Sequence, residues 1–341
     1  MGRVRPLERS DLVKVADLRG RVFRHSAYGS PEALAVRLER VFLANPWYDE
    51  ALSSLVYEDG EGLTGFLGVV PRPLRLNGRS VRAAALAQFM VAPSARGIPG
   101  MLLYKAAFRR DQELLFTDIS TSGARELWQQ MGGETSFPYA VSQTLVLRPA
   151  HHAGRRGGLL GRLVGAVARL LEPHVVPPRP EGLRTDASAQ DVANAMDMTG
   201  AGRLHGSYGE TTGWLLDCVR DRPTGATTVA VLESSPGTPV GWFVVRHAGG
   251  ESHVYAMGAA PAHRQTLLDA MVWDAASRGA SALHLRYDDA FVMPLREAGA
   301  QAAVRGNGVL FRTQDREVGR EILAGRAVLT GLEGEWWMGF S

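Results

Sequence analysis

The two halves of this 341-residue chain repeat one order of predicted elements, and this repetition limits the fold more than any other feature. In the first half, alternating apolar residues predict three strands, which are joined by turns at 58–62 and at Asn77-Gly78. The predicted elements of this half are strands 53–57, 63–72 and 82–91, a helix 100–110, a strand 113–119 and a helix 124–131. Two helices, 10–23 and 31–43, precede them, the second with Ser30 as N-cap.

The second half offers the same elements in the same order. They are helices 189–198 and 211–219, strands 227–232, 240–247 and 252–259, a helix 265–278, a strand 282–287 and a helix 291–297. Gly65-Phe66 and Gly241-Trp242 open equivalent strands. Each half therefore predicts an α/β unit with a mixed sheet flanked by helices.

A change of composition separates the halves. Residues 151–158 form a polar, glycine-rich break, and prolines follow at 173, 177, 178 and 180. Between them, residues 159–171 predict a short amphipathic helix, which is either a linker helix packed between domains, the interpretation we favour, or a membrane-surface anchor. We expect a first domain at 1–148, a linker at 149–182 and a second domain at 183–341.

Composition narrows the function classes. The net charge of +3 is modest, and the basic residues are scattered, so we expect no nucleic-acid partner. No apolar run is long enough to span a membrane, and the charged start does not resemble a signal peptide. Cys218 stands alone, and no Cys/His group has zinc-ligand spacing, so we expect no disulfide and no metal. A cytoplasmic protein fits these features best.

The stretch 88–104 reads as a buried strand, a glycine-containing loop and the start of a helix. Free amides and the positive dipole end at a helix start attract anions, and Arg96 adds a fixed charge. The spacing matches neither the P-loop nor the dinucleotide-binding glycine pattern. The run Arg96-Gly97-Ile98-Pro99-Gly100 resembles the pyrophosphate loop of the GNAT superfamily of acyl-CoA-dependent N-acyltransferases, many of them bacterial.

The order of elements resembles that of a tandem GNAT protein over nearly the full length. This resemblance implies two GNAT-like domains, with acetyl-CoA or another acyl-CoA as co-substrate and no metal. It also implies a bulged strand that splays from its neighbour to admit the pantetheine arm. The implied coenzyme-binding residues are Phe89, Met90, Val91, Arg96, Gly97, Ile98, Gly100, Met101 and Ser122.

Catalytic candidates surround the same opening. The family usually carries a tyrosine on the helix that follows the second of the two splayed strands. This chain has Trp128 there, and an indole cannot serve as a proton source. Asp118, at the end of that strand, is either the base for the amine or a cap for the following turn. Gln88 is a polar residue near the opening. His25 and His205 lie in loops where the family binds acceptors, although solvated surface histidines are commoner.

The second half lacks glycines in the corresponding loop, 259–265, so we interpret it as a degenerate copy. Asp288 and Asp289 either cap the next helix, the usual role, or reach into a cleft. The aromatic-rich tail 332–340 either docks as a final strand, which we favour, or lines a sugar- or acyl-binding surface.

We therefore expect an N-acetyltransferase of the GNAT type that transfers an acyl group to the amine of a small acceptor, such as an amino sugar. Two alternatives remain: a Fem-type aminoacyl-tRNA-dependent ligase and a non-catalytic acyl-CoA-binding module. A homodimer stays open.

Overall fold

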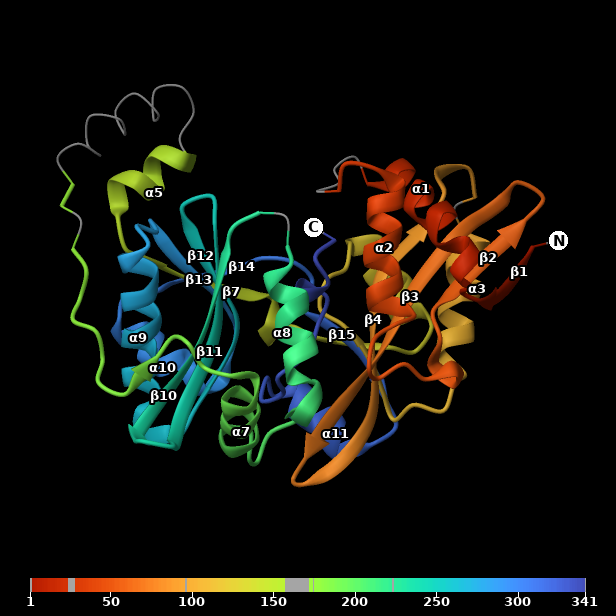
Figure 1. The fold of residues 1–341 in the computed structure, drawn as a ribbon. Helices are drawn as coiled ribbons and strands as arrows, with labels where there is room; N and C mark the ends of the chain where they lie inside the picture. Colours follow the sequence, from red (N-terminus) through yellow and green to blue (C-terminus); the bar gives the residue numbers. More distant parts are fainter. Residues whose placement is uncertain are drawn as a thin grey trace. The chain divides into compact units, whose positions relative to one another are not determined.

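The computed structural model describes residues 2–23, 28–95, 97–156, 172–173, 175–222 and 224–340 (Figure 1). The chain forms two compact units. Unit 1 comprises Met1–Pro138, Gly202–Ser207 and Gly306–Ser341, and unit 2 comprises Tyr139–Ala201 and Tyr208–Arg305. Each unit is a mixed sheet flanked by helices, as the sequence predicts.

The sheet of unit 1 has the strand order β1-β2-β3-β4-β5-β15-β6, and β9 pairs with β3. Its strands are β1 (Arg3–Pro6), β2 (Leu55–Asp59), β3 (Gly62–Leu76), β4 (Arg79–Val91), β5 (Leu114–Thr117), β6 (Glu134–Ser136), β9 (His205–Gly206) and β15 (Val309–Thr313). Most neighbours are antiparallel, whereas β4 and β5 run parallel.

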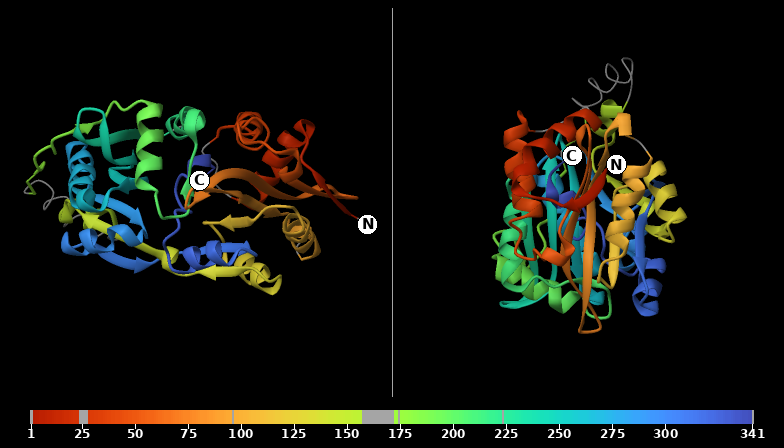
Figure 2. Two further views of the ribbon diagram at one scale, coloured as in Figure 1. Left: turned by 90° about the horizontal axis from the view of Figure 1, so that it is seen from below. Right: turned by 90° about the vertical axis from the view of Figure 1, so that its right-hand side faces the viewer.

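Helices cover both faces of this sheet. They are α1 (Leu12–Val22), α2 (Pro31–Phe42), α3 (Ile98–Phe108), α4 (Ser122–Gln130) and α11 (Arg316–Leu323). A Cβ atom added to Gly68 of β3 would meet Phe42 of α2, whereas one added to Gly65 would meet Leu103 of α3. Because these positions differ by an odd number in one strand, α2 and α3 lie on opposite faces, which Figure 2 shows.

Local sequence signals explain several of these boundaries. Asn77 and Gly78 both have positive φ, 51° and 79°, the conformation that a two-residue hairpin between β3 and β4 requires. The Ser30 hydroxyl accepts a hydrogen bond from the Ala33 amide at 3.2 Å, and Pro31 occupies the first turn of α2. Both predictions are confirmed.

The sheet of unit 2 has the order β14-β7-β13-β12-β11-β10-β8. Its strands are β7 (Val141–Val146), β8 (Leu183–Arg184), β10 (Ala226–Ser235), β11 (Thr238–Ala248), β12 (Glu251–Ala259), β13 (Ala282–Arg286) and β14 (Gln301–Val304). Its helices are α5 (Pro149–Arg156), α7 (Ala189–Thr199), α8 (Thr212–Arg220), α9 (Arg264–Ser277) and α10 (Val292–Glu297). Again one strand pair, β12 and β13, is parallel.

Each sheet includes strands from the opposite half of the chain, and unit 1 takes two of them among the described residues, β9 beside β3 and β15. Strand β7, which precedes the linker, pairs with β13 in unit 2, and β15, near the end of the chain, pairs with β5 and β6 in unit 1. The units therefore differ from the consecutive segments 1–148 and 183–341 that the sequence predicts. Alternating strand patterns indicate where a strand lies but not which sheet it joins.

Two local expectations are wrong. Residues 149–156 form α5, so most of the expected glycine-rich break at 151–158 is helical. The tail is not a strand: it ends in a 3-10 turn, η8 (Trp336–Met338), whose Trp337 is fully buried. The amphipathic helix expected at 159–171 lies outside the described residues.

The exchange of β15 makes a prediction for stability. Leu310 of β15 is fully buried in the core of unit 1, whereas Leu323 of α11 is 47% exposed. We expect Leu310→Ala to lower the free energy of unfolding by about 2–5 kcal/mol, measured by urea denaturation, because it leaves a cavity. Leu323→Ala is the matched control, with an expected change of about 0.5 kcal/mol or less. Equal effects of the two substitutions would contradict the assignment of β15 to this core.

Candidate active site

Strands β4 and β5 of unit 1 separate along their length. They pair at only three positions, Ala83 with Leu114 through Ala85 with Phe116, and β4 then continues to Val91 without this neighbour. A β-bulge interrupts the β3–β4 register after Ala87, and Gln88 takes a positive φ of 50°. The bulged, splayed strand that the resemblance implies is therefore present.

A cavity of about 800 Å³ lies where the two strands diverge. Its walls are mainly apolar and come from α1, β4, α3, the segment after β5, α4 and the tail. They comprise Arg19, Val22, Phe23, Leu86, Ala87, Gln88, Phe89, Val91, Gly97, Gly100, Tyr104, Thr117, Ile119, Ser120, Thr121, Gly123, Ala124, Leu127, Glu335, Trp336 and Phe340. A volume of this size is typical of small-molecule sites.

The glycine loop borders this cavity as predicted. Gly97 is the N-cap of α3 with φ 109°, a conformation that L side chains rarely adopt. A Cβ on Gly100 would lie 2.9 Å from the Phe89 ring, which itself stacks on Tyr104 with ring centres 4.4 Å apart. The first amides of a helix have no partner within it, so this helix start can receive an anion. Arg96 lies outside the described residues.

Gln88 links helix α1 to the tail. Its side-chain oxygen accepts a hydrogen bond from Arg19 Nε at 2.8 Å, and its side-chain amide donates to Glu335. Its backbone amide also donates to Glu335 Oε1, at 3.0 Å. The bulge thus directs the backbone amide and the side-chain amide of Gln88 to one carboxylate. Arg19 also donates a hydrogen bond to the Phe340 carbonyl.

Asp118 holds the backbone of the tail at Glu335. Its Oδ1 accepts a hydrogen bond from the Glu335 backbone amide at 2.8 Å, and a Cβ on Gly334 would lie 2.2 Å from this carboxyl group. Asp118 is only 4% exposed, and the described residues that line the cavity do not include it. Thr121, not Asp118, caps α4. Asp118 therefore positions Glu335, and its expected role as a base stays a prediction.

Burial raises the pKa of Glu335 to about 7, and the nearby charge of Asp118 adds to the rise. The two hydrogen bonds from Gln88 and the charge of Arg19 oppose it. Burial also raises the pKa of Tyr104, so this phenol keeps its proton and can donate a hydrogen bond into the cavity. A carboxyl group that titrates near neutrality beside a cavity is suited to proton transfer.

The predicted coenzyme residues divide into two groups. Phe89, Val91, Gly97 and Gly100 line the cavity, with Gln88. The other described residues of this set do not line the cavity. Met90 is 1% exposed on the other side of β4. Ile98 and Met101 are exposed on α3, and Ser122 is exposed at the start of α4.

Trp128 belongs to the core and not to the cavity wall, which corrects its expected place beside the thioester. The side chain is fully buried, and its indole N–H donates to the Phe311 carbonyl of β15 at 3.1 Å. Its ring packs edge-on against Tyr104 and Phe108. With its donor engaged, Trp128 holds α4 to β15.

The sequence analysis missed Glu335 and Arg19. The tail had been noticed for its aromatic residues, and its second interpretation, a lining surface, agrees with Trp336 and Phe340 in the cavity wall. The acidic residue directly before Trp336 was the overlooked signal. His25 lies outside the described residues, and His205 binds the carbonyl of its neighbour Gly206 at 2.8 Å.

The corresponding region of unit 2 carries no similar set of groups among its described residues. Its loop after β12 contains the 3-10 turn η6 (Pro261–His263), without glycines. Asp288 accepts a hydrogen bond from the Ala290 amide at 2.9 Å and so caps the turn before α10, the more usual role expected for it.

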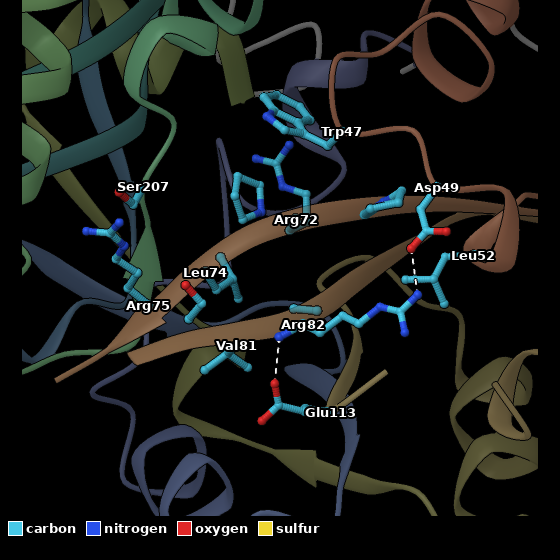
Figure 3. Close-up of a pocket in the computed structure, with 14 residues that line it drawn as sticks. Trp47, Asp49, Leu52, Arg72, Leu74, Arg75, Val81, Arg82, Glu113 and Ser207 are labelled. Carbon is cyan, nitrogen blue, oxygen red and sulfur yellow. Dashed lines mark hydrogen bonds and ion pairs between the residues drawn. The ribbon is translucent and has the colours of Figure 1, made fainter. Parts of the chain in front are cut away.

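A second cavity of unit 1, about 410 Å³, lies over β3 and β4 (Figure 3). Two of its cations, Arg72 and Arg82, already have acidic partners. Arg82 binds Asp49 at 2.6 Å, and Arg72 pairs with Glu333 at 3.3 Å while its guanidinium lies 4.9 Å from the centre of the Trp47 ring. Because these charges are neutralised, we assign the active site to the larger cavity.

Comparison with known proteins agrees with this geometry. Residues 3–103 match the model of an acetyltransferase (GNAT) domain. This match covers β1 to the first half of α3, which includes the bulged strand and the glycine loop. This part of the chain is thus similar to a GNAT domain.

Solved structures with the same fold cover almost the whole chain. A probable N-acyltransferase of Enterococcus faecalis is 17% identical with a TM-score of 0.61, covering 92% of this chain and 72% of its own. A GCN5-related N-acetyltransferase of Kribbella flavida is 18% identical with a TM-score of 0.61. The match covers 96% of this chain and 74% of the Kribbella flavida chain.

A third structure with this fold has an acyl-CoA bound. It is the Saccharomyces cerevisiae N-myristoyltransferase with myristoyl-CoA, which is 13% identical with a TM-score of 0.55 and covers 91% of this chain and 77% of its own. Among curated proteins, none matches this sequence significantly. Within the described segments, no helix is both long and apolar enough to cross a bilayer.

The raised pKa of Glu335 makes stability depend on pH. Between the ordinary pKa of 4.5 and about 7, the folded protein keeps a proton that the unfolded chain has lost, so stability falls as pH rises through this range. Glu335→Gln removes this proton uptake. We expect the variant to match the parent near pH 5 and to exceed its stability near pH 8, on the order of 2–3 kcal/mol, in urea titrations.

Glu126 of α4 is exposed and offers the control. We expect Glu126→Gln to change the free energy of unfolding by the same amount near pH 5 and near pH 8. A Glu335→Gln variant that is no more stable than the parent near pH 8 would contradict the burial of an ionisable carboxyl group here.

Proposed function

We propose that this GNAT protein transfers an acetyl or other acyl group from acyl-CoA to the amine of a small acceptor, with Glu335 as the base. The observation that carries the proposal is the cavity between β4 and β5, bordered at one side by the glycine loop and at another by a carboxyl group with a pKa near 7. This combination supplies both an anion-binding helix start and a proton acceptor.

Two features of this cavity suit an acyl-CoA: the glycine loop and the part of β4 that has no partner in β5. Gly97 and Gly100 leave the loop backbone accessible from the cavity, and an added Cβ at Gly100 would meet Phe89. Beyond residue 85, β4 has no parallel partner in β5, so its backbone groups there can pair with an amide-containing arm. When bound, the co-substrate supplies the activated thioester carbonyl.

The proposed reaction requires these residues to remove a proton from the amine and to hold the reacting groups. An amine arrives protonated, and ionised Glu335 takes that proton, so that the amine nitrogen can attack the carbonyl carbon. The new bond is C–N and the C–S bond breaks; the thiolate leaves with the electron pair and takes up the second proton of the attacking nitrogen, so that an amide and a free thiol result. Tyr104 keeps its own proton because burial raises its pKa, and it contributes hydrogen-bond donation and shape rather than acid catalysis.

Neighbouring groups prepare Glu335 for this role. Gln88 holds Oε1 with two donors, and Asp118 holds the backbone of the same residue. The carboxylate is therefore fixed in place before substrate binds, which lowers the cost of reaching the reactive geometry. An apolar wall from Phe89, Trp336 and Phe340 limits water in the cavity.

A first experiment tests the coenzyme site. Gly100→Ala places a methyl group against Phe89 at the cavity wall, so we expect acetyl-CoA affinity to fall about tenfold or more in calorimetric titration. Gly20→Ala on α1 is the matched control, because nothing lies within 4 Å of its added Cβ, and its affinity should be unchanged. Equal affinity in both variants would remove the assignment of the loop.

A second experiment tests the base. With acetyl-CoA and a panel of amines, kcat/KM should rise with pH and bend near pH 7 as Glu335 loses its proton. Glu335→Gln should lower kcat/KM by about 10²–10⁴-fold and remove the bend, while acetyl-CoA still binds. Glu126→Gln serves as the control, with an unchanged profile.

The remaining outcomes distinguish the alternatives. Acetyl-CoA binding without turnover of any amine would favour the non-catalytic module, and tRNA binding without acetyl-CoA binding would favour a Fem-type ligase. A parent-like rate and bend in Glu335→Gln would show that another group takes the proton.

A further inference from the structure

Unit 2 gathers three histidines and one glutamate at the start of β12. Glu251 and His253 are two residues apart on this strand, so their side chains lie on the same face of the sheet. His284 of β13 pairs directly with His253 in the parallel register, and the two rings stack with centres 4.7 Å apart. His152 approaches the same carboxylate from α5.

The distances suit a shared cation. One ligand atom each from Glu251, His253 and His284 lie within 4.8 Å of one another. His284 Nε2 is 3.2 Å from Glu251 Oε2, and His152 Nδ1 is 3.2 Å from Oε1. Ligand atoms around a tetrahedral zinc ion lie ~3.4 Å apart, close to the two 3.2 Å separations from the Glu251 carboxylate.

His152 supplies a second, independent observation. The side chain is only 7% exposed, and neither ring nitrogen forms a hydrogen bond of good geometry with any described residue. A buried imidazole without hydrogen bonds is costly, since its polar atoms have lost water without replacement. Its Nδ1 lies 3.2 Å from Glu251 Oε1, so the ring points into the cluster.

A supporting residue orients His284. The Thr144 hydroxyl of β7 lies 3.1 Å from His284 Nδ1, which directs Nε2 toward Glu251. Metal-binding histidines usually have their second nitrogen held in this way. Thr144 is itself placed by the pairing of β7 with β13, at the register position of His284.

We propose that Glu251, His253, His284 and His152 form a structural site for a divalent transition metal of the zinc class. Imidazole nitrogens with one carboxylate oxygen are ligands that zinc favours, and four protein ligands leave no open position for catalysis. The sequence analysis expected no metal, because these residues are spread from 152 to 284 and form no local motif. Only the fold brings them together.

The position of the site gives the metal a structural task. Strands β12 and β13 pair at only two positions, Ser252 with Leu283 and His253 with His284. A metal ion at this point ties β12, β13 and α5 together where the two strands share only two paired positions. The alternative is a metal-free network in which the histidines contact Glu251 directly.

The experiment uses the full chain without an affinity tag, after treatment with a chelator and removal of the chelator. Zinc chloride is titrated calorimetrically, and cobalt(II) chloride is added separately to record the visible absorption of tetrahedral cobalt. We expect one zinc ion per chain, a cobalt band of tetrahedral type, and a rise in melting temperature on zinc addition.

Variants locate the site. His253→Gln and His284→Gln should abolish stoichiometric zinc binding and the cobalt band, whereas His263→Gln, outside the cluster in η6, should retain both. Thr144→Val keeps the shape of the side chain and should weaken zinc binding about 10- to 100-fold. Far-UV circular dichroism verifies folding, and Thr144→Val, which alters no ligand, carries the test if a histidine variant fails to fold.

Parent protein that binds no zinc at one per chain would overturn the proposal in favour of the metal-free network. Zinc binding that survives unchanged in folded His253→Gln and His284→Gln would overturn it as well.

Discussion

Parallel pairing between β4 and β5 stops after Ala85, and the proposed site exists because it stops. A sheet that continued its pairing would leave no opening for a ligand and no unpaired backbone on β4. The bulge at Gln88 redirects the strand at this point and turns a side chain and a backbone amide toward the same carboxylate. One local departure from regular structure therefore creates both the cavity and the environment of Glu335.

The sequence predicted the parts of the molecule that depend on local signals. The Asn77-Gly78 hairpin, the Ser30 cap and the repeated order of elements follow from turn chemistry and periodicity, and the structure confirms them. The glycine loop was recognised for the same reason, since Gly97 needs its positive φ and Gly100 has no room for a side chain. Such signals depend only on neighbouring residues.

What the sequence could not supply were contacts between distant segments. Glu335 lies 247 residues from Gln88 in the chain, and no local pattern marks it as the partner of the bulge. Trp128 failed as a site residue for a related reason, because the acceptor of its N–H is the Phe311 carbonyl, which β15 brings from the far end of the sequence. The zinc ligands proposed for unit 2 are likewise assembled only by strand pairing.

The exchange of strands has a consequence for how the protein is made in the cell. Residues 306–341 leave the ribosome after all of unit 2, yet they provide β15 for the first sheet and Glu335 for its cavity. Domains usually fold in the order of synthesis. Here unit 1 is incomplete until residues 306–341 have been made, so β5 and β6 of a nascent chain lack their β15 partner while all of unit 2 is synthesised.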